Sequence, residues 1–104
     1  MAIADMHLIR KALVTLTIEQ ALLEIGGTGL LNEVLRILYE KSQCYLPDCF
    51  DKPENFRKIW NEIDEGTCNM MVDLVKEKLE EFAYQKPIEK FLVGLNQIKC
   101  VTRG

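Results

Sequence analysis

The four cysteines are the side chains in this chain of 104 residues with the widest chemical range. A structural zinc ion takes four tetrahedral ligands, commonly supplied as two close pairs. Cys44 and Cys49 have four residues between them, but Cys68 and Cys100 stand alone. The single histidine, His7, is far from all of them in the sequence. We therefore expect small buried hydrophobic side chains and no metal site, with Cys44, Cys49 and Cys68 as the alternative ligands.

Three further patterns could indicate a phosphate-binding loop, a nucleophilic serine or a pair of catalytic carboxylates, but each lacks a residue or motif that such a site needs. Gly26-Gly27-Thr28-Gly29 stands before an expected helix, but no Lys-Ser or Lys-Thr pair follows, as a phosphate loop needs. Ser42 is the only serine and no nucleophile-elbow motif surrounds it. Glu62, Asp64 and Glu65 fit helix caps and a solvated face better than paired catalytic carboxylates. The sequence thus predicts no catalytic residue, no cofactor and no enzymatic activity.

Composition and charge narrow the class of protein. The chain is 48% apolar and 28% charged, as in ordinary globular domains, and its length fits one domain. Its net charge is -3, and Lys and Arg are interspersed with Asp and Glu rather than gathered in a basic stripe. This pattern argues against nucleic-acid and membrane-surface binding. No apolar run could span a bilayer and no signal peptide is evident, so we expect a cytoplasmic protein with reduced cysteines.

Four punctuation points divide the chain into segments of helical length. They are Gly26-Gly27, Asp51-Lys52-Pro53-Glu54, Gly66-Thr67 and Lys86-Pro87. Between them, apolar residues recur every three or four positions, which is the period of an amphipathic helix. The pattern predicts an all-α fold, a compact bundle of four to five helices.

The first segment, residues 3–25, is predicted as one helix with two apolar faces. Met6, Ile9, Leu13 and Leu16 fall on one face, and Ile18, Leu22 and Ile25 on another. Thr17-Ile18-Glu19-Gln20 also matches a capping box, so a break near Thr17 is the alternative. The corresponding domain division is an N-terminal helix or arm at 1–16, possibly continuous with the bundle. The bundle itself would occupy 17–99, and 100–104 would fray.

Later segments follow the same logic. A helix from Thr28 to Ser42 would turn Val34, Leu35 and Leu38 inward. A third would start at Asp51, with Pro53 in its first turn, and end at Gly66. The fourth would open at Thr67 and bury Leu79, and the fifth would begin at Pro87.

The connection 43–52 is rich in apolar residues for a loop. It could lie over the bundle as a lid, or it could offer an exposed patch to a partner. Together with the N-terminal helix it supplies the predicted partner surface: Ile9, Leu13, Tyr45 and Phe50.

Two stretches resemble a known family. They are Ile18-Glu19-Gln20-Ala21-Leu22-Leu23-Glu24-Ile25-Gly26 and Tyr45-Leu46-Pro47-Asp48-Cys49-Phe50-Asp51-Lys52-Pro53-Glu54. Both look like the Nitrosopumilus-type output domains, a small archaeal family of helical modules found alone or attached to signalling proteins. The similarity covers about residues 18–95 and carries over no catalytic residue. It implies an archaeal regulatory module and treats residues 1–16 as lying outside it.

We therefore expect a non-enzymatic signal-transduction output or protein-interaction domain. Its partner would be a protein, with a homodimer through the N-terminal helix as one form of that partnership. The alternative is a thiol- or metal-dependent sensor using Cys44, Cys49 and Cys68.

Overall fold

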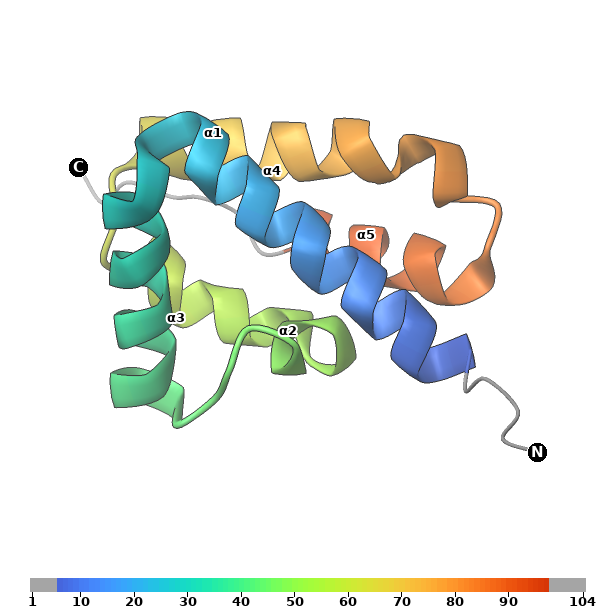
Figure 1. Cartoon of the computed structure of the whole chain (residues 1–104), viewed down its shortest axis with the longest axis horizontal. Coiled ribbons are helices and arrows are strands. Elements are labelled where there is room, and N and C mark those ends of the chain that lie inside the picture. The colour runs from blue at the N-terminus through green and yellow to red at the C-terminus, as the bar shows by residue number, and fades with distance from the viewer. Residues whose placement is uncertain (1–5, 98–104) are drawn as a thin grey trace.

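The computed structural model describes residues 6–97, and within them every regular element is helical. The elements are α1 (Met6–Ser42), α2 (Asp48–Asp51), η1 (Pro53–Asn55), α3 (Phe56–Trp60), α4 (Glu65–Leu79), η2 (Glu80–Phe82) and α5 (Lys86–Gln97). Figure 1 shows them gathered into one bundle. The all-α prediction is confirmed. The expectations for residues 1–5 and 98–104, including the frayed end at 100–104, lie outside the described residues.

Helix α1 consists of two helical segments joined at Gly27. That residue has φ 67° and ψ −164°, a backbone conformation that only glycine adopts readily. The chain turns sharply there, so the segments before and after Gly27 run in different directions (Figure 1). The predicted helix stop at Gly26-Gly27 is therefore confirmed.

The alternative break near Thr17 does not occur. Thr17 is buried within the helix, and its hydroxyl donates a hydrogen bond of 2.8 Å to the Leu13 carbonyl one turn earlier. This bond replaces the capping box that the sequence offered. Residues 6–16 are thus continuous with the rest of the first segment.

Both segments of α1 contribute to one hydrophobic core. Each packs an apolar stripe toward the shorter helices, and α1 contacts α2, α3, α4 and α5. The fully buried side chains of largest volume come from α1, α3, α4 and α5: Val14, Ile18, Leu22, Ile37, Leu38, Phe56, Ile59, Met71, Leu79, Ile88, Phe91 and Leu95. The short elements are therefore held by α1 rather than by one another alone.

The predicted inward faces of α1 need correction. Leu35 is 36% exposed although it was expected to face inward, and Leu16, which shares the predicted face of Ile9 and Leu13, is 51% exposed. Val14 and Ile37 are buried in their place. Because α1 carries apolar residues on more than one side, the spacing of three and four residues fits two rotations of the helix equally well.

The connection after α1 lies over the bundle as a lid. Leu46, Cys49 and Phe50 are buried, and the Asp48 carboxylate accepts a 2.9 Å hydrogen bond from the Tyr45 amide. The reason is composition: the segment has enough apolar surface to join the core, and α2 satisfies its backbone donors. Among the apolar residues of this lid, Tyr45 and Pro47 are exposed.

Two predicted helix starts are displaced. Asp51 ends α2 instead of starting the third helix, and Pro53 opens the short turn η1. Helix α4 is capped by Asp64, whose carboxylate accepts a 2.9 Å bond from the Thr67 amide. Asp64 therefore takes the cap position, and Gly66 and Thr67 lie in the first turn of α4. The start of α5 at Lys86-Pro87 is as predicted.

Within residues 6–97, no helix combines the length and the apolar character needed to cross a bilayer.

Gly27→Ala tests the turn in α1. A Cβ at φ 67° is strained whatever space surrounds it, so we expect a loss of about 1–3 kcal/mol in the free energy of unfolding. Gly29→Ala is the matched control, since a Cβ there meets nothing within 4 Å and alanine favours helix. Urea denaturation of both variants measures the difference. Equal stabilities would mean that Gly27 does not hold a glycine-only conformation.

Leu79→Ala and Leu35→Ala test the corrected faces. Leu79 is 0% exposed, so its truncation should cost about 2–5 kcal/mol. Truncation of the partly exposed Leu35 should lower the free energy of unfolding by less than about 1 kcal/mol, close to the range for surface positions. Similar losses in the two variants, measured by the same denaturation, would contradict the rotation of α1 described above.

Candidate functional site

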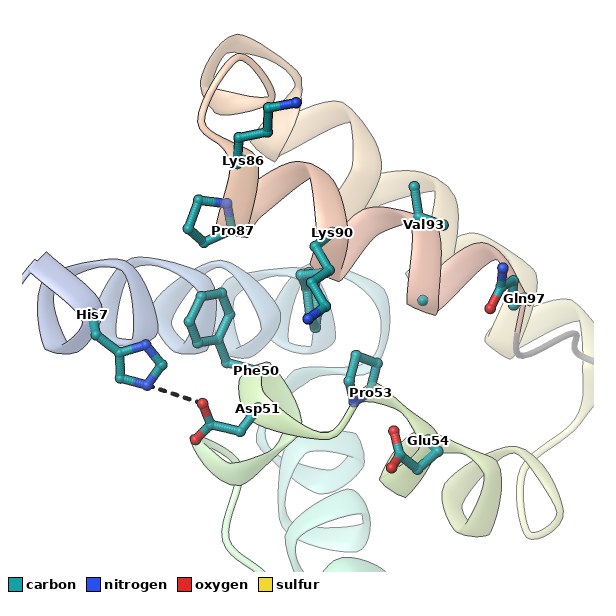
Figure 2. Close-up of a pocket in the computed structure, with 12 residues that line it drawn as sticks. His7, Phe50, Asp51, Pro53, Glu54, Lys86, Pro87, Lys90, Val93 and Gln97 are labelled. Atoms are coloured by element: carbon teal, nitrogen blue, oxygen red, sulfur yellow. Dashed lines mark ion pairs between the residues drawn. The ribbon is translucent and has the colours of Figure 1, made fainter.

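A cavity of about 670 Å³ opens where the first turn of α1, the α2–η1 junction and α5 meet. Figure 2 shows its walls. His7 comes from α1, Phe50 and Asp51 from α2, and Pro53 from η1, while Lys90 extends from α5 into the space between them. The volume lies within the range usual for small-molecule sites.

Aromatic contacts fix the floor of this cavity. The Phe50 ring lies 5.5 Å from the His7 ring and 6.0 Å from the Phe91 ring, centroid to centroid. Phe91 in turn approaches Phe56, which stacks on Trp60 at 5.1 Å. The cavity floor is therefore the outer end of a chain of rings that runs into the core, and its shape is held by core packing.

A close approach of backbone elements closes one side of the cavity. A Cβ on Gly94 would stand 3.0 Å from the Pro53 ring, so glycine allows α5 to lie directly against η1. The sequence marks Pro53 as a helix start but gives no sign of its contact with Gly94, because the two residues are distant along the chain.

Asp51 joins the α2 lid to α1 through contacts with two side chains, Lys11 and His7. Its carboxylate lies 2.7 Å from Nζ of Lys11 and 2.9 Å from Nε2 of His7 (Figure 2 draws the latter contact). The hydrogen bond and charge of Lys11 hold the pKa of the Asp51 carboxyl below its ordinary value. The same bond raises the pKa of the Lys11 ammonium. We call these three residues the lid clasp.

The remaining charges of the cavity lie at its rim. Lys86 and Lys90 come from α5, and Glu54 comes from η1. Figure 2 shows Lys86 pointing away from the cavity and Lys90 pointing into it. No ion pair joins Lys90 or Glu54 to any other residue in the range 6–97.

The cysteines do not lie together in a site. Cys49 is fully buried, and burial raises the pKa of its thiol to about 12, so it is a poor nucleophile. Cys44 is half-buried; its thiol donates to the Ser42 carbonyl and accepts from the Asn55 amide. Cys68 is buried in α4. Cys100 lies outside the described residues.

No metal site emerges from the part of the chain that the structure describes. Within residues 6–97, no three side chains of His, Cys, Asp or Glu gather closely enough to hold a metal ion.

The predicted partner surface is only partly accessible. Ile9 and Tyr45 are exposed, but Leu13 packs half-buried against the core and Phe50 is buried. Leu16, predicted on the same face as Ile9, is exposed, and so are Leu8, Ala12 and Leu23, which the predicted face did not include. We call Leu8, Ile9, Ala12, Leu16 and Leu23 the outer face of α1. A shallow groove of about 330 Å³ borders this face, lined by Leu8, Ala12, Leu16, Glu19 and Pro47 among others.

Asp51→Asn tests the lid clasp through its pH dependence. The folded pKa of Asp51 is depressed below 3.8, so its contribution to stability is present above about pH 4 and is lost as the pH falls through the folded pKa. The variant should have a lower Tm than the wild type at pH 7, and the difference should shrink toward pH 2. Asp73→Asn is the control, because Asp73 is exposed and pairs with no cation in the described chain. A constant difference across this pH range would show that the clasp does not stabilise the fold.

No family model, no curated protein and no solved structure matches this chain.

Proposed function

We propose that this protein is a non-enzymatic interaction module that forms a homodimer through the outer face of α1. The observation that carries the proposal is that α1 is apolar on two opposite sides. One side makes the core, and the other exposes Leu8, Ile9, Leu16 and Leu23. A helix that is apolar on all sides is normally covered on all sides, so we expect another surface to pack against this exposed face.

The spacing on the outer face favours another helix as the covering surface. Ile9, Leu16 and Leu23 are seven residues apart, and Ala12 lies between the first two. Side chains at intervals of seven residues form the seam of paired helices, and a small side chain such as Ala12 allows close approach. Since the same face would meet itself across a two-fold axis, a second copy of this chain satisfies the geometry.

Charge selects the direction of pairing. Glu19 borders the outer face between Leu16 and Leu23. Parallel helices in register would bring two Glu19 carboxylates together, which is unfavourable. An antiparallel pair centred on Leu16 separates them and places Ile9 of one copy opposite Leu23 of the second. With one helix face per copy, the interface is at the small end of the specific range, so a weak dimer is expected.

The resemblance to archaeal output domains agrees with this proposal, because it implies a regulatory module and carries over no catalytic residue. The resemblance itself stays a prediction, as does the cytoplasmic location. The alternative of a thiol or metal sensor finds little support, since Cys49 and Cys68 are both buried and burial raises the pKa of the Cys49 thiol.

Leu16→Glu tests the homodimer. Two charges placed at the centre of the pair should raise the dimer dissociation constant by more than about tenfold, equivalent to about 1.4 kcal/mol. Sedimentation equilibrium over a range of concentrations measures the constant. Met70→Glu is the matched control, because Met70 is 53% exposed but lies on α4, away from the outer face.

Circular dichroism should be unchanged in both variants, since neither side chain belongs to the core. A wild type that stays monomeric at every attainable concentration would refute the proposal. Equal dissociation constants for the wild type and Leu16→Glu would also refute it. Leu13→Asp is a poor test, because Leu13 packs against the core and its loss would disturb folding.

A further inference from the structure

We propose that the cavity between α1, α2, η1 and α5 binds a small organic carboxylate with an aromatic or branched aliphatic body. The inference rests on the cavity alone and does not depend on the homodimer. Its grounds are an apolar floor fixed by core packing and a cation directed into the space above it.

The floor suits a flat or branched apolar group. Phe50 and Phe91 present ring surface, and Pro53, Pro87 and Val93 complete the apolar lining. Phe50 and Phe91 are themselves buried, so little side-chain entropy remains to be lost when a ligand covers them. A pre-formed apolar surface of this kind, with few polar groups around it, is the usual form of a small-molecule site.

The polar groups favour an anion. Asp51 also lines the cavity, but its carboxylate is already engaged by Lys11 and His7. Lys90 points into the cavity and forms no ion pair with another described residue. A ligand carboxylate above the Phe50 ring would meet the Lys90 ammonium, with Lys86 adding positive charge at the rim. Glu54 stands at the opposite side, toward Pro53, and would repel an anion placed there.

A ligand in this cavity would connect elements that are distant in sequence. His7 belongs to the first turn of α1, whereas Lys90 belongs to α5. An occupant that contacts both should stabilise the folded state, because it binds the assembled cavity and not the unfolded chain. Binding should therefore raise the Tm of the full chain, and above the dissociation constant the rise should follow the logarithm of ligand concentration.

The probe for this proposal is 2-naphthoate, a bicyclic aromatic carboxylate. Its neutral and cationic counterparts, 2-naphthamide and 2-naphthylmethylammonium, have the same ring system and separate the contribution of charge. Titrations followed by amide chemical shifts in two-dimensional NMR give both a dissociation constant and a location. We expect saturable binding of 2-naphthoate, tighter than that of the amide and the amine, with shifts centred on Phe50, Glu54, Phe91 and Gly94.

Two variants with matched controls assign the contacts. Lys90→Ala should weaken 2-naphthoate binding about fivefold, as expected for an accessible ion pair, and leave 2-naphthamide unchanged. Lys58→Ala is the control, since Lys58 is exposed on α3 and does not line the cavity. Val93→Trp should abolish binding of both probes by filling the space, whereas Met70→Trp on α4 should not.

Several results would overturn the proposal. Tighter binding of the cationic probe would mean that Glu54 and not Lys90 sets the ligand charge. Equal dissociation constants of 2-naphthoate for the wild type and Lys90→Ala would show that Lys90 does not contact the carboxylate. Amide chemical-shift changes centred on α4 would show that the probe binds outside the cavity. No saturable shift with any of the three probes would show that the cavity does not hold small aromatic ligands. Lys90 and Val93 are exposed, so their variants should keep the wild-type circular dichroism spectrum. That spectrum checks that each variant is folded.

Discussion

The turn at Gly27 lets one long helix form two sides of the hydrophobic core. Without it, the 37 residues of α1 would form a straight rod of roughly 55 Å, too long for a domain of this size to cover. With it, one helix supplies two walls of a single core. Val14 and Ile18 come from the segment before the turn, and Val34 and Leu38 from the segment after it. The shorter helices then need only fill the angle between these walls (Figure 1).

The first segment of α1 takes part in the core and in both proposed binding surfaces. The first segment of α1 forms the core with one side, the outer face with the other, and one wall of the cavity with its first turn. A partner on the outer face and a ligand beside His7 would therefore both act on the same rigid segment. Any effect of one on the affinity for the other must be reciprocal, because the two binding equilibria share one free-energy cycle. The lid clasp lies between them, since Lys11 belongs to α1 and Asp51 to the lid.

The sequence predicts those features of the fold that depend on residues adjacent in the chain. The stop at Gly26-Gly27 and the start at Lys86-Pro87 depend on a few adjacent residues, and the structure has both. The rotation of α1 could not be predicted, because a helix with two apolar sides gives no preference for one over the other. Asp51 misled in another way: beside Pro53 and Glu54 it matches a helix start, yet it closes α2 and reaches across to Lys11. Only the tertiary arrangement brings these residues together, so no local pattern could reveal the clasp or the cavity behind it.

The lid explains why the cavity can be expected to keep its shape in solution. Its buried side chains, Leu46, Cys49 and Phe50, belong to the same hydrophobic core as α3 and α5. Phe50 serves two purposes, because one part of its ring packs on Phe91 and another part faces the cavity. Opening the lid would therefore expose core surface and break the contact of Asp51 with Lys11 at the same time. A surface loop free of the core would move on a nanosecond to microsecond timescale, but this segment should open only with the bundle itself. The cavity is for that reason a feature of the folded core, and a ligand would find it already formed.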